Sequence, residues 1–120
     1  MKWLSRTEEM ILLSVAFLGE KAYGLAIREQ LNNLGRQRFS VGAVYVPLER
    51  LSDRGFLSTR EGEPTPERGG RSKRYYELSQ KGEEALEEIR ELNKILWSGY
   101  SAPESNESSD SASSLVVAAI

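Results

Sequence analysis

The segment from Ser40 to Gly55 constrains the fold of this chain more than any other stretch. Ser40 is a preferred residue for capping the start of a helix, and Gly55 suits the left-handed backbone that often ends one. Between them, apolar residues recur at steps of three and four, which predicts a helix with one face in a hydrophobic core. Pro47 should kink this helix, because proline removes one backbone hydrogen bond. The core-facing residues are predicted to be Val41, Val44, Leu48 and Leu51.

The opposite face of this helix has small, uncharged residues in its first turns and acidic residues only in its last two turns. A helix that enters the DNA major groove needs small residues near its N-terminus, where close approach is required and a phosphate is favoured. The alternative is a core helix with an ordinary solvent face, and this segment alone does not separate the two. The residues expected to contact DNA are Ser40, Gly42, Ala43, Tyr45, Val46 and Arg50.

Two helices are predicted ahead of this segment. Ser5 and Glu8 form a capping-box pattern that starts the first helix. The apolar run over residues 10–18 predicts that this helix is buried on nearly all sides. After a break, a second helix is expected over residues 23–34, followed by a short turn. Two short helices joined in this way, the second with a face that suits a groove, predict a helix-turn-helix.

Two stretches after Gly55 have strand propensity, residues 56–61 and 74–78. The glycines, prolines and basic residues of 62–73 predict a hairpin with a long basic tip. A helix-turn-helix followed by such a hairpin predicts a winged helix, in which Tyr76 and Leu78 face the core. Basic residues in the wing are expected to contact phosphates or the minor groove, although a solvated turn is the alternative. They are Arg71, Lys73 and Arg74.

Ser79 is expected to cap a last helix that has a wide apolar side and a row of glutamates opposite. An apolar side this wide predicts two partners, the helix's own domain and a second chain. The predicted fold is therefore mainly α with a small β-hairpin. It has a winged helix-turn-helix over 1–78, a dimerisation helix over 79–97 and a flexible Ser/Glu-rich tail over 98–120. The expected dimer interface consists of Ala85, Leu86, Ile89, Leu92, Leu96 and Trp97.

The distribution of charge agrees with a DNA-binding centre better than the net charge of −2 does. Residues 36–74 hold nine basic against five acidic residues, whereas residues 75–120 hold three against nine. The chain has no cysteine and no histidine, which argues against disulfides, zinc sites and the common catalytic triads. We expect no enzymatic activity, no metal and no cofactor. The apolar run near the start is too short to span a membrane, so cytoplasmic residence without a membrane partner is expected.

Four short motifs follow one another over roughly residues 7–97: Tyr23-Gly24-Leu25, Ser40 to Leu51, Gly55-Phe56-Leu57 and Arg74 to Gly82. In this order they resemble the PadR family of bacterial transcriptional regulators. A proline after the tyrosine of the third helix is a habit of that family, which accounts for Pro47. Val46 departs from the pattern, since the family often places tyrosine directly before the proline, and the tail has no family counterpart.

The resemblance implies a homodimeric repressor on a pseudo-palindromic operator in double-stranded DNA, with the last helix as the dimer interface. The single C-terminal helix is similar to the smaller PadR subgroup. Some members release DNA in response to aromatic compounds or drugs, so Trp97 and Tyr100 are candidate residues for a small aromatic effector. For Trp97 the alternative is simple filling of an interface. The alternative for the whole chain is a winged-helix module that only associates with proteins, which the basic wing argues against.

Overall fold

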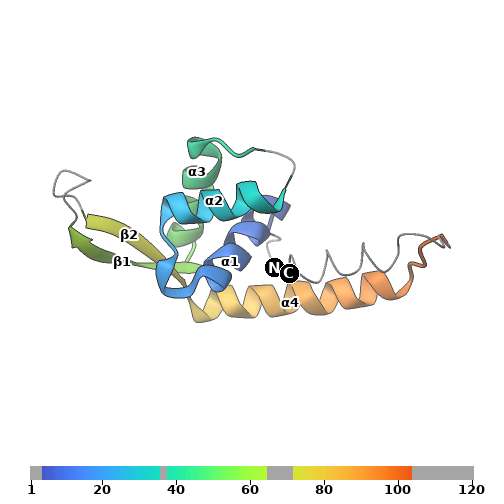
Figure 1. The fold of residues 1–120 in the computed structure, drawn as a ribbon. Helices are drawn as coiled ribbons and strands as arrows, with labels where there is room; N and C mark the ends of the chain where they lie inside the picture. Colours follow the sequence, from blue (N-terminus) through green and yellow to red (C-terminus); the bar gives the residue numbers. More distant parts are fainter. Residues whose placement is uncertain (1–3, 36–37, 65–71, 104–120) are drawn as a thin grey trace. The chain divides into compact units, whose positions relative to one another are not determined.

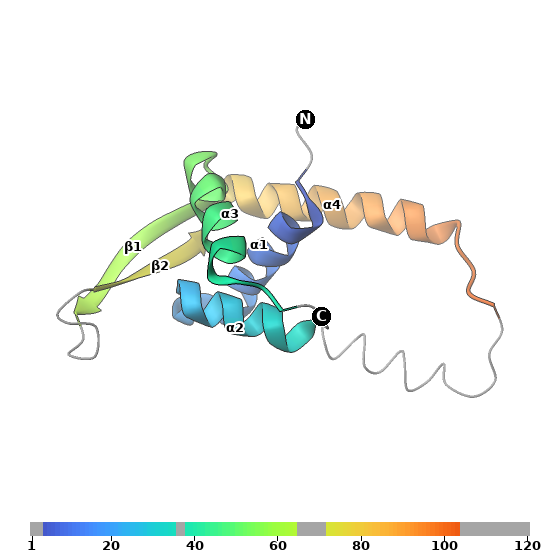
Figure 2. The same cartoon turned by 90° about the horizontal axis from the view of Figure 1, so that it is seen from above.

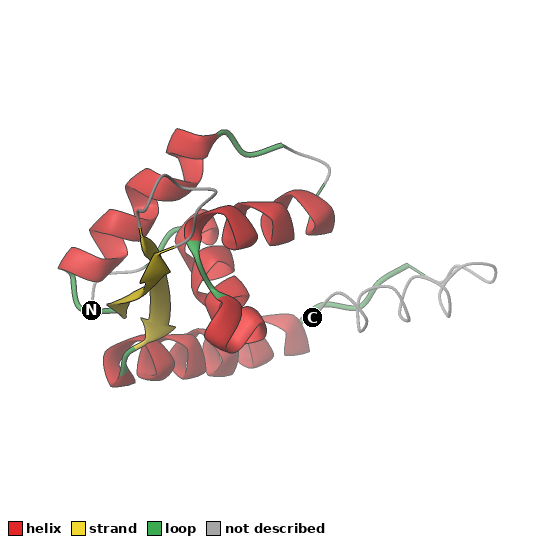
Figure 3. Cartoon of the chain, turned by 60° about the vertical axis from the view of Figure 1, so that its left-hand side comes forward, coloured by secondary structure: helices red, strands yellow, loops and turns green. Residues whose placement is uncertain are grey.

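A computed structural model of the chain describes residues 4–35, 38–64 and 72–103, and the tail from 104 onward lies outside them. Apart from one two-stranded sheet, the regular structure in these ranges is helical, so the predicted mainly α winged helix is confirmed (Figures 1 and 3). The elements are α1 (Arg6–Leu18), a 3-10 turn (Gly19–Lys21), α2 (Gly24–Leu34), α3 (Val41–Asp53), β1 (Leu57–Pro64), β2 (Ser72–Leu78) and α4 (Gln80–Ser98).

The chain divides into two compact units, residues 1–89 and 90–120, and α4 runs from the first into the second. In the described part of the chain, no helix combines the length and the apolar character needed to cross a membrane.

The capping box predicted at the start of α1 is confirmed. Ser5 Oγ accepts a hydrogen bond from Glu8 N at 3.1 Å, and Ser5 N donates to Glu8 Oε1 at 2.8 Å. The second carboxylate oxygen of Glu8 accepts from Arg54 Nη1 at 3.3 Å, although the Glu8 side chain is only 8% exposed. Glu8 therefore joins the first turn of α1 to the residue that follows α3.

The prediction that α1 is buried on nearly all sides is wrong. Leu13 is 46% exposed and Phe17 is 70% exposed, while the polar Ser14 is buried. α1 packs against α2, α3 and β2, and these neighbours cover only the face that carries Ile11, Leu12 and Val15. One face of α1 thus packs into the core, while its other face exposes apolar side chains to solvent.

α3 begins and ends where the sequence predicts. Ser40 Oγ accepts from Ala43 N at 3.1 Å, and Gly55 has a φ of +84°. The amide of Gly55 donates to the carbonyl of Ser52, and that of Phe56 donates to the carbonyl of Leu51 at 2.9 Å. This pair of bonds is the arrangement in which a left-handed glycine stops a helix and satisfies its last carbonyls.

The core face of α3 is one turn shorter than predicted. Val44, Leu48 and Leu51 are fully buried, but Val41 is 52% exposed, so its predicted place in the core is wrong. Val41 is the first helical residue, and the buried residues of α3 begin only with Val44, one turn later. Pro47 lies inside a helix that continues on both sides of it.

β1 and β2 pair antiparallel, with Leu57 opposite Leu78 and Arg60 opposite Tyr75. The strands extend beyond their predicted ends, so residues 62–64 and 72–73 belong to strands rather than to the tip of the hairpin. Tyr76 is 2% exposed and Leu78 packs against the core, as predicted. Tyr76 N also donates to Ala22 O at 2.8 Å, which ties β2 to the turn before α2.

The hydrophobic core lies between α1, α2, α3 and the base of the hairpin (Figure 2). α4 starts against the end of α3: Ser79 Oγ accepts from Gly82 N at 3.1 Å and donates to Gly55 O at 2.5 Å, and Lys81 Nζ donates to Arg54 O at 2.7 Å. Gly82 is buried here, and glycine is required because a Cβ at this position would overlap the Phe56 carbonyl oxygen.

Candidate nucleic-acid interface

Side chains of α2 fix the turn that leads into α3. Arg28 Nε donates to the carbonyl of Phe39 at 2.8 Å, and Asn32 Oδ1 accepts from the amide of Phe39 at 2.7 Å. Both backbone groups of Phe39 are therefore held just before Ser40, the residue that caps α3. These bonds set where the N-terminal end of α3 lies relative to α2.

The predicted contact residues of α3 lie together on one exposed surface, with Tyr45 as the exception. Ala43 and Arg50 are exposed, Val46 is 56% exposed, and open space surrounds the position of a Cβ at Gly42. The small residues Gly42, Ala43 and Val46 leave the backbone of the first two turns accessible. A helix needs such an accessible backbone to lie deep in a groove.

Tyr45 is half-buried, because its ring lies against the backbone of Gly24 at the start of α2. A Cβ at position 24 would overlap the tyrosine ring, so glycine is required there while Tyr45 is present. Sequence reasoning grouped Tyr45 with the exposed contact residues and missed this contact, because the helical repeat gives no sign of a neighbour on another helix.

The three predicted basic residues of the wing differ in their surroundings. Lys73 Nζ lies 4.3 Å from the centre of the Tyr23 ring. Arg74 Nη1 lies 2.7 Å from Glu49 Oε1, so an ion pair joins β2 to α3. Arg71 falls outside the described residues. The sequence indicated a positive charge at Arg74 but gave no sign of its partner, which is 25 residues away along the chain.

Tyr76 is the third member of this link between α3 and β2. Its hydroxyl donates to Glu49 Oε1 across 3.5 Å, a long contact. Burial raises the pKa of the Tyr76 hydroxyl, because the phenolate would lose its hydration. Hydrogen bonding with Tyr76, followed by the charge of Glu49, raises the pKa of Arg74 above its ordinary value. The guanidinium is therefore a permanent cation beside the carboxylate.

Aromatic and basic side chains anchor the base of the wing. The rings of Tyr23 and Tyr75 meet edge to face, with centres 5.7 Å apart, and the Arg60 guanidinium lies 4.5 Å from the Tyr75 ring. Arg60 also donates to the carbonyl of Glu20 at 3.0 Å and pairs with Glu77 at 3.2 Å. The strands are thus attached to the turn before α2, which limits how the wing moves relative to the helices.

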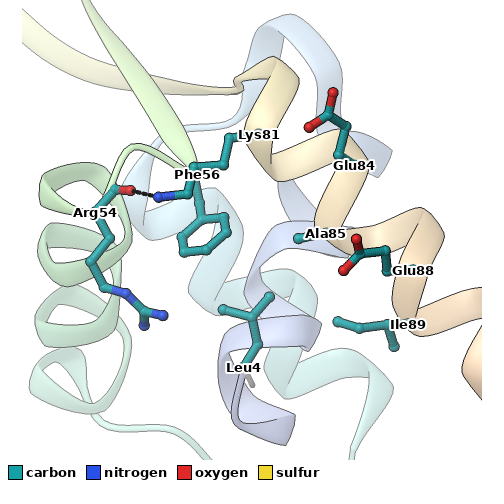
Figure 4. A pocket seen from close by; sticks show the side chains of 8 residues that line it. All are labelled: Leu4, Arg54, Phe56, Lys81, Glu84, Ala85, Glu88 and Ile89. Atoms are coloured by element: carbon teal, nitrogen blue, oxygen red, sulfur yellow. Dashed lines mark hydrogen bonds between the residues drawn. The ribbon is translucent and has the colours of Figure 1, made fainter. Parts of the chain in front are cut away.

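A pocket of about 460 Å³ lies between the start of α1, the end of α3 and the first turns of α4 (Figure 4). Its lining is apolar at Leu4, Phe56, Ala85 and Ile89, and charged residues of both signs stand around it. Ala85 and Ile89 belong to the predicted dimer interface, whereas Trp97 and Tyr100, the candidate effector residues, do not line this pocket.

The apolar side of α4 becomes more exposed toward its end. Leu86 and Leu92 are half-buried, whereas Leu96 is 63% and Trp97 is 66% exposed. Trp97 meets Tyr100 edge to face, with ring centres 5.5 Å apart. Among the residues of the predicted interface, Leu96 and Trp97 are therefore exposed, whereas the others are half-buried.

Among the residues that the structure describes, no group of acidic side chains could hold a metal ion. The chain matches the model of the transcriptional regulator PadR-like family over residues 12–88, more than half its length. It belongs to the PadR family. The resemblance inferred from the motifs is therefore confirmed, and the protein is a DNA-binding transcriptional regulator by family and fold.

Solved structures of PadR proteins share this fold. A PadR-like transcription factor from Bacteroides fragilis is 32% identical, with a TM-score of 0.58, over 74% of this chain and 84% of that one. A PadR-like regulator from Bacillus cereus is 25% identical, with a TM-score of 0.62, over 76% and 84%. A PadR-family regulator from Eggerthella lenta is 24% identical, with a TM-score of 0.60, over 75% and 76%, and shows likeness of fold. These relatives are transcription regulators rather than enzymes. No curated protein matches the chain.

Proposed function

We propose that this PadR protein is a homodimeric repressor that binds a pseudo-palindromic operator with α3 in the major groove. The observation that carries the proposal is the exposed surface of small residues on the first turns of α3, beside the basic residues of β2. Gly42 permits close approach, Ala43 and Val46 are suited to thymine methyl groups, and Arg50 adds a positive charge. The Ser40 hydroxyl contacts the sugar-phosphate backbone of the DNA, and Tyr45, whose hydroxyl end lies against Gly24, lies at the margin of this contact. Its site of action is the cytoplasm.

The wing supplies contacts to the phosphates or the minor groove through Arg71, Lys73 and Arg74. Such contacts are independent of sequence and release counterions, so they govern the salt dependence of binding. Arg74 can donate to a phosphate, but its pairing with Glu49 offsets its charge, and Arg60 on β1 pairs with Glu77. Lys73 is then the basic side chain of β2 without a carboxylate partner among the residues described.

Dimerisation through α4 sets the spacing of the two recognition helices. The exposed Leu96 and Trp97 support this part of the proposal, because large apolar side chains at the end of a helix are usually covered by a partner. Ala85, Leu86, Ile89 and Leu92 continue the interface toward the start of the helix. Two half-sites about one helical turn apart would then be read together.

We further propose that a small aromatic effector binds at Trp97 and Tyr100 and releases the repressor from DNA. The two rings are exposed and already in contact, which supports stacking of a planar compound. Tryptophan fluorescence with planar aromatic compounds tests this role, with Trp97→Ala as the control. Equal binding by the variant would leave Trp97 as a residue that only fills the interface.

The substitution Gly42→Glu tests the placement of DNA on α3. Position 42 is open, and an acid in the first turn of a helix is favourable, so the fold should be retained. In the complex the carboxylate would lie against phosphates. At about 1–3 kcal/mol per lost groove contact and two copies per dimer, affinity should fall at least about 30-fold. Gln80→Glu adds the same charge to the first turn of α4 and should bind normally. Normal binding by Gly42→Glu would exclude α3 as the reading helix.

A further inference from the structure

The ion pair between Glu49 and Arg74 is unusual for its position. Glu49 lies on the exposed face of α3 that also carries Gly42, Val46 and Arg50, and its side chain is 53% exposed. An acid on a surface that approaches DNA is repelled by phosphates. Arg74, on β2, is 48% exposed, so the pair lies at the surface between the recognition helix and the wing.

The stability of the fold gives little reason for this pair. Ion pairs that are half exposed contribute little to folding, because water already solvates both charges. α3 and β2 are held in place independently, by the buried Leu48, Leu51 and Tyr76. The charge of Glu49 therefore matters more for what this surface presents to a ligand than for the fold.

The effect of the pair on DNA binding follows from charge. Arg74 is a permanent cation, and the Glu49 carboxylate at 2.7 Å cancels its charge as seen from a phosphate several ångströms away. A neutral pair displaces no net counterion from DNA, whereas a lone arginine displaces nearly one. The chain thus places a basic residue in the wing and neutralises it from the recognition helix.

We propose that Glu49 sets the strength of DNA binding: by pairing with Arg74 it removes one positive charge per protomer from the surface that meets the phosphates. The inference rests on the proposed placement of DNA on α3 and the wing. Its consequence is weak binding to DNA of arbitrary sequence, so that the operator must be held mainly by the groove contacts of α3.

The test measures binding of the full chain to two duplexes of unrelated arbitrary sequence, by fluorescence anisotropy, from 50 to 200 mM KCl. Glu49→Gln keeps the size of the side chain and an oxygen acceptor for Arg74 but removes the charge. The slope of log K against log salt should become steeper by up to about 0.9 per protomer. Between 50 and 200 mM this corresponds to an additional loss of about 3-fold per protomer and about 12-fold per dimer.

Glu91→Gln is the matched control, because Glu91 forms an exposed ion pair with Lys94 on α4, at 3.4 Å, and the change in net charge is the same. The control should retain the wild-type slope. Thermal unfolding of both variants should stay close to that of the wild type.

Three results would overturn the inference. An unchanged slope in Glu49→Gln would mean that the pair does not face phosphates. Weaker binding would mean that Glu49 positions Arg74 for a phosphate instead of neutralising it. Tighter binding of Glu49→Gln to one duplex but not to the other would mean that Glu49 reads a base. If the wild-type protein showed no salt-dependent binding, the proposed DNA-binding surface itself would be refuted. This result needs no variant, so it is distinct from a failure of the inference about Glu49.

Discussion

Gly82 and Gly42 allow one substitution to be compared at two helical sites with opposite surroundings. Alanine is favoured over glycine in a helix by about 1 kcal/mol, less in the first turn, where both residues lie. At position 42 a methyl group would meet no atom within 4 Å. At position 82 it would overlap the Phe56 carbonyl oxygen and lie 3.3 Å from Leu78 Cδ2.

The carbonyl of Phe56 has little freedom to move, because it accepts a hydrogen bond from Ser79 N at 3.2 Å. If α4 shifted instead, the bonds from Ser79 to Gly55 and from Lys81 to Arg54 would lengthen. Overpacking costs about 1–3 kcal/mol and a weakened hydrogen bond costs about 1 kcal/mol. After the gain in helix propensity, Gly82→Ala should destabilise the fold by about 1–3 kcal/mol.

For a domain of this size, a loss of 1 kcal/mol lowers the melting temperature by about 4–8 °C. Thermal unfolding followed by circular dichroism should therefore show Gly82→Ala melting at least about 4 °C below the wild type. Gly42→Ala should melt at the wild-type temperature or slightly above. Equal melting temperatures for the two variants would refute the close packing of α4 against the Phe56 carbonyl.

Two further predictions concern assembly and pH. Leu96→Arg should leave the fold intact and give a monomer in sedimentation at micromolar concentration, because Leu96 is exposed within its own chain; a dimer equal to that of the control Ser98→Arg would contradict the proposed interface. The raised pKa of Tyr76 means that the folded state keeps this proton above pH 10 while the unfolded state loses it, so stability is full below pH 10 and falls as pH rises above it. Denaturant titrations at pH 9 and 11 should show a smaller fall in the free energy of unfolding for Tyr76→Phe than for the wild type; equal falls would contradict this role.

The sequence predicted the elements whose signals are local. The caps at Ser5, Ser40 and Ser79 and the stop at Gly55 follow from hydrogen bonds within a few residues, and the structure has all four. The sequence failed where burial depends on distant neighbours. Val41 matches the apolar spacing of α3, yet it is 52% exposed, because burial also needs a neighbouring element that the spacing does not show.

The same limit applies to the candidate site. The positions of Gly42, Ala43 and Val46 follow from the helical repeat and were predicted together with their exposure. The partners of Arg74 and Tyr45 were not, since Glu49 and Gly24 approach them only after the chain has folded. Periodicity locates a side chain on a face of its helix, but it does not identify what lies across from it.

Glu8 has a further consequence for the order in which the chain opens. Its two carboxylate oxygens are divided between Ser5 N, at the N-cap of α1, and Arg54, after the last turn of α3. Helix ends normally fray independently of one another, and these local openings are among those that cost a protein the least free energy. Here the end of α3 cannot fray without leaving the largely buried Glu8 carboxylate, at the start of α1, without its arginine partner. Amide protons near both ends should therefore exchange with solvent together, at a rate closer to that of the core than to that of a free terminus.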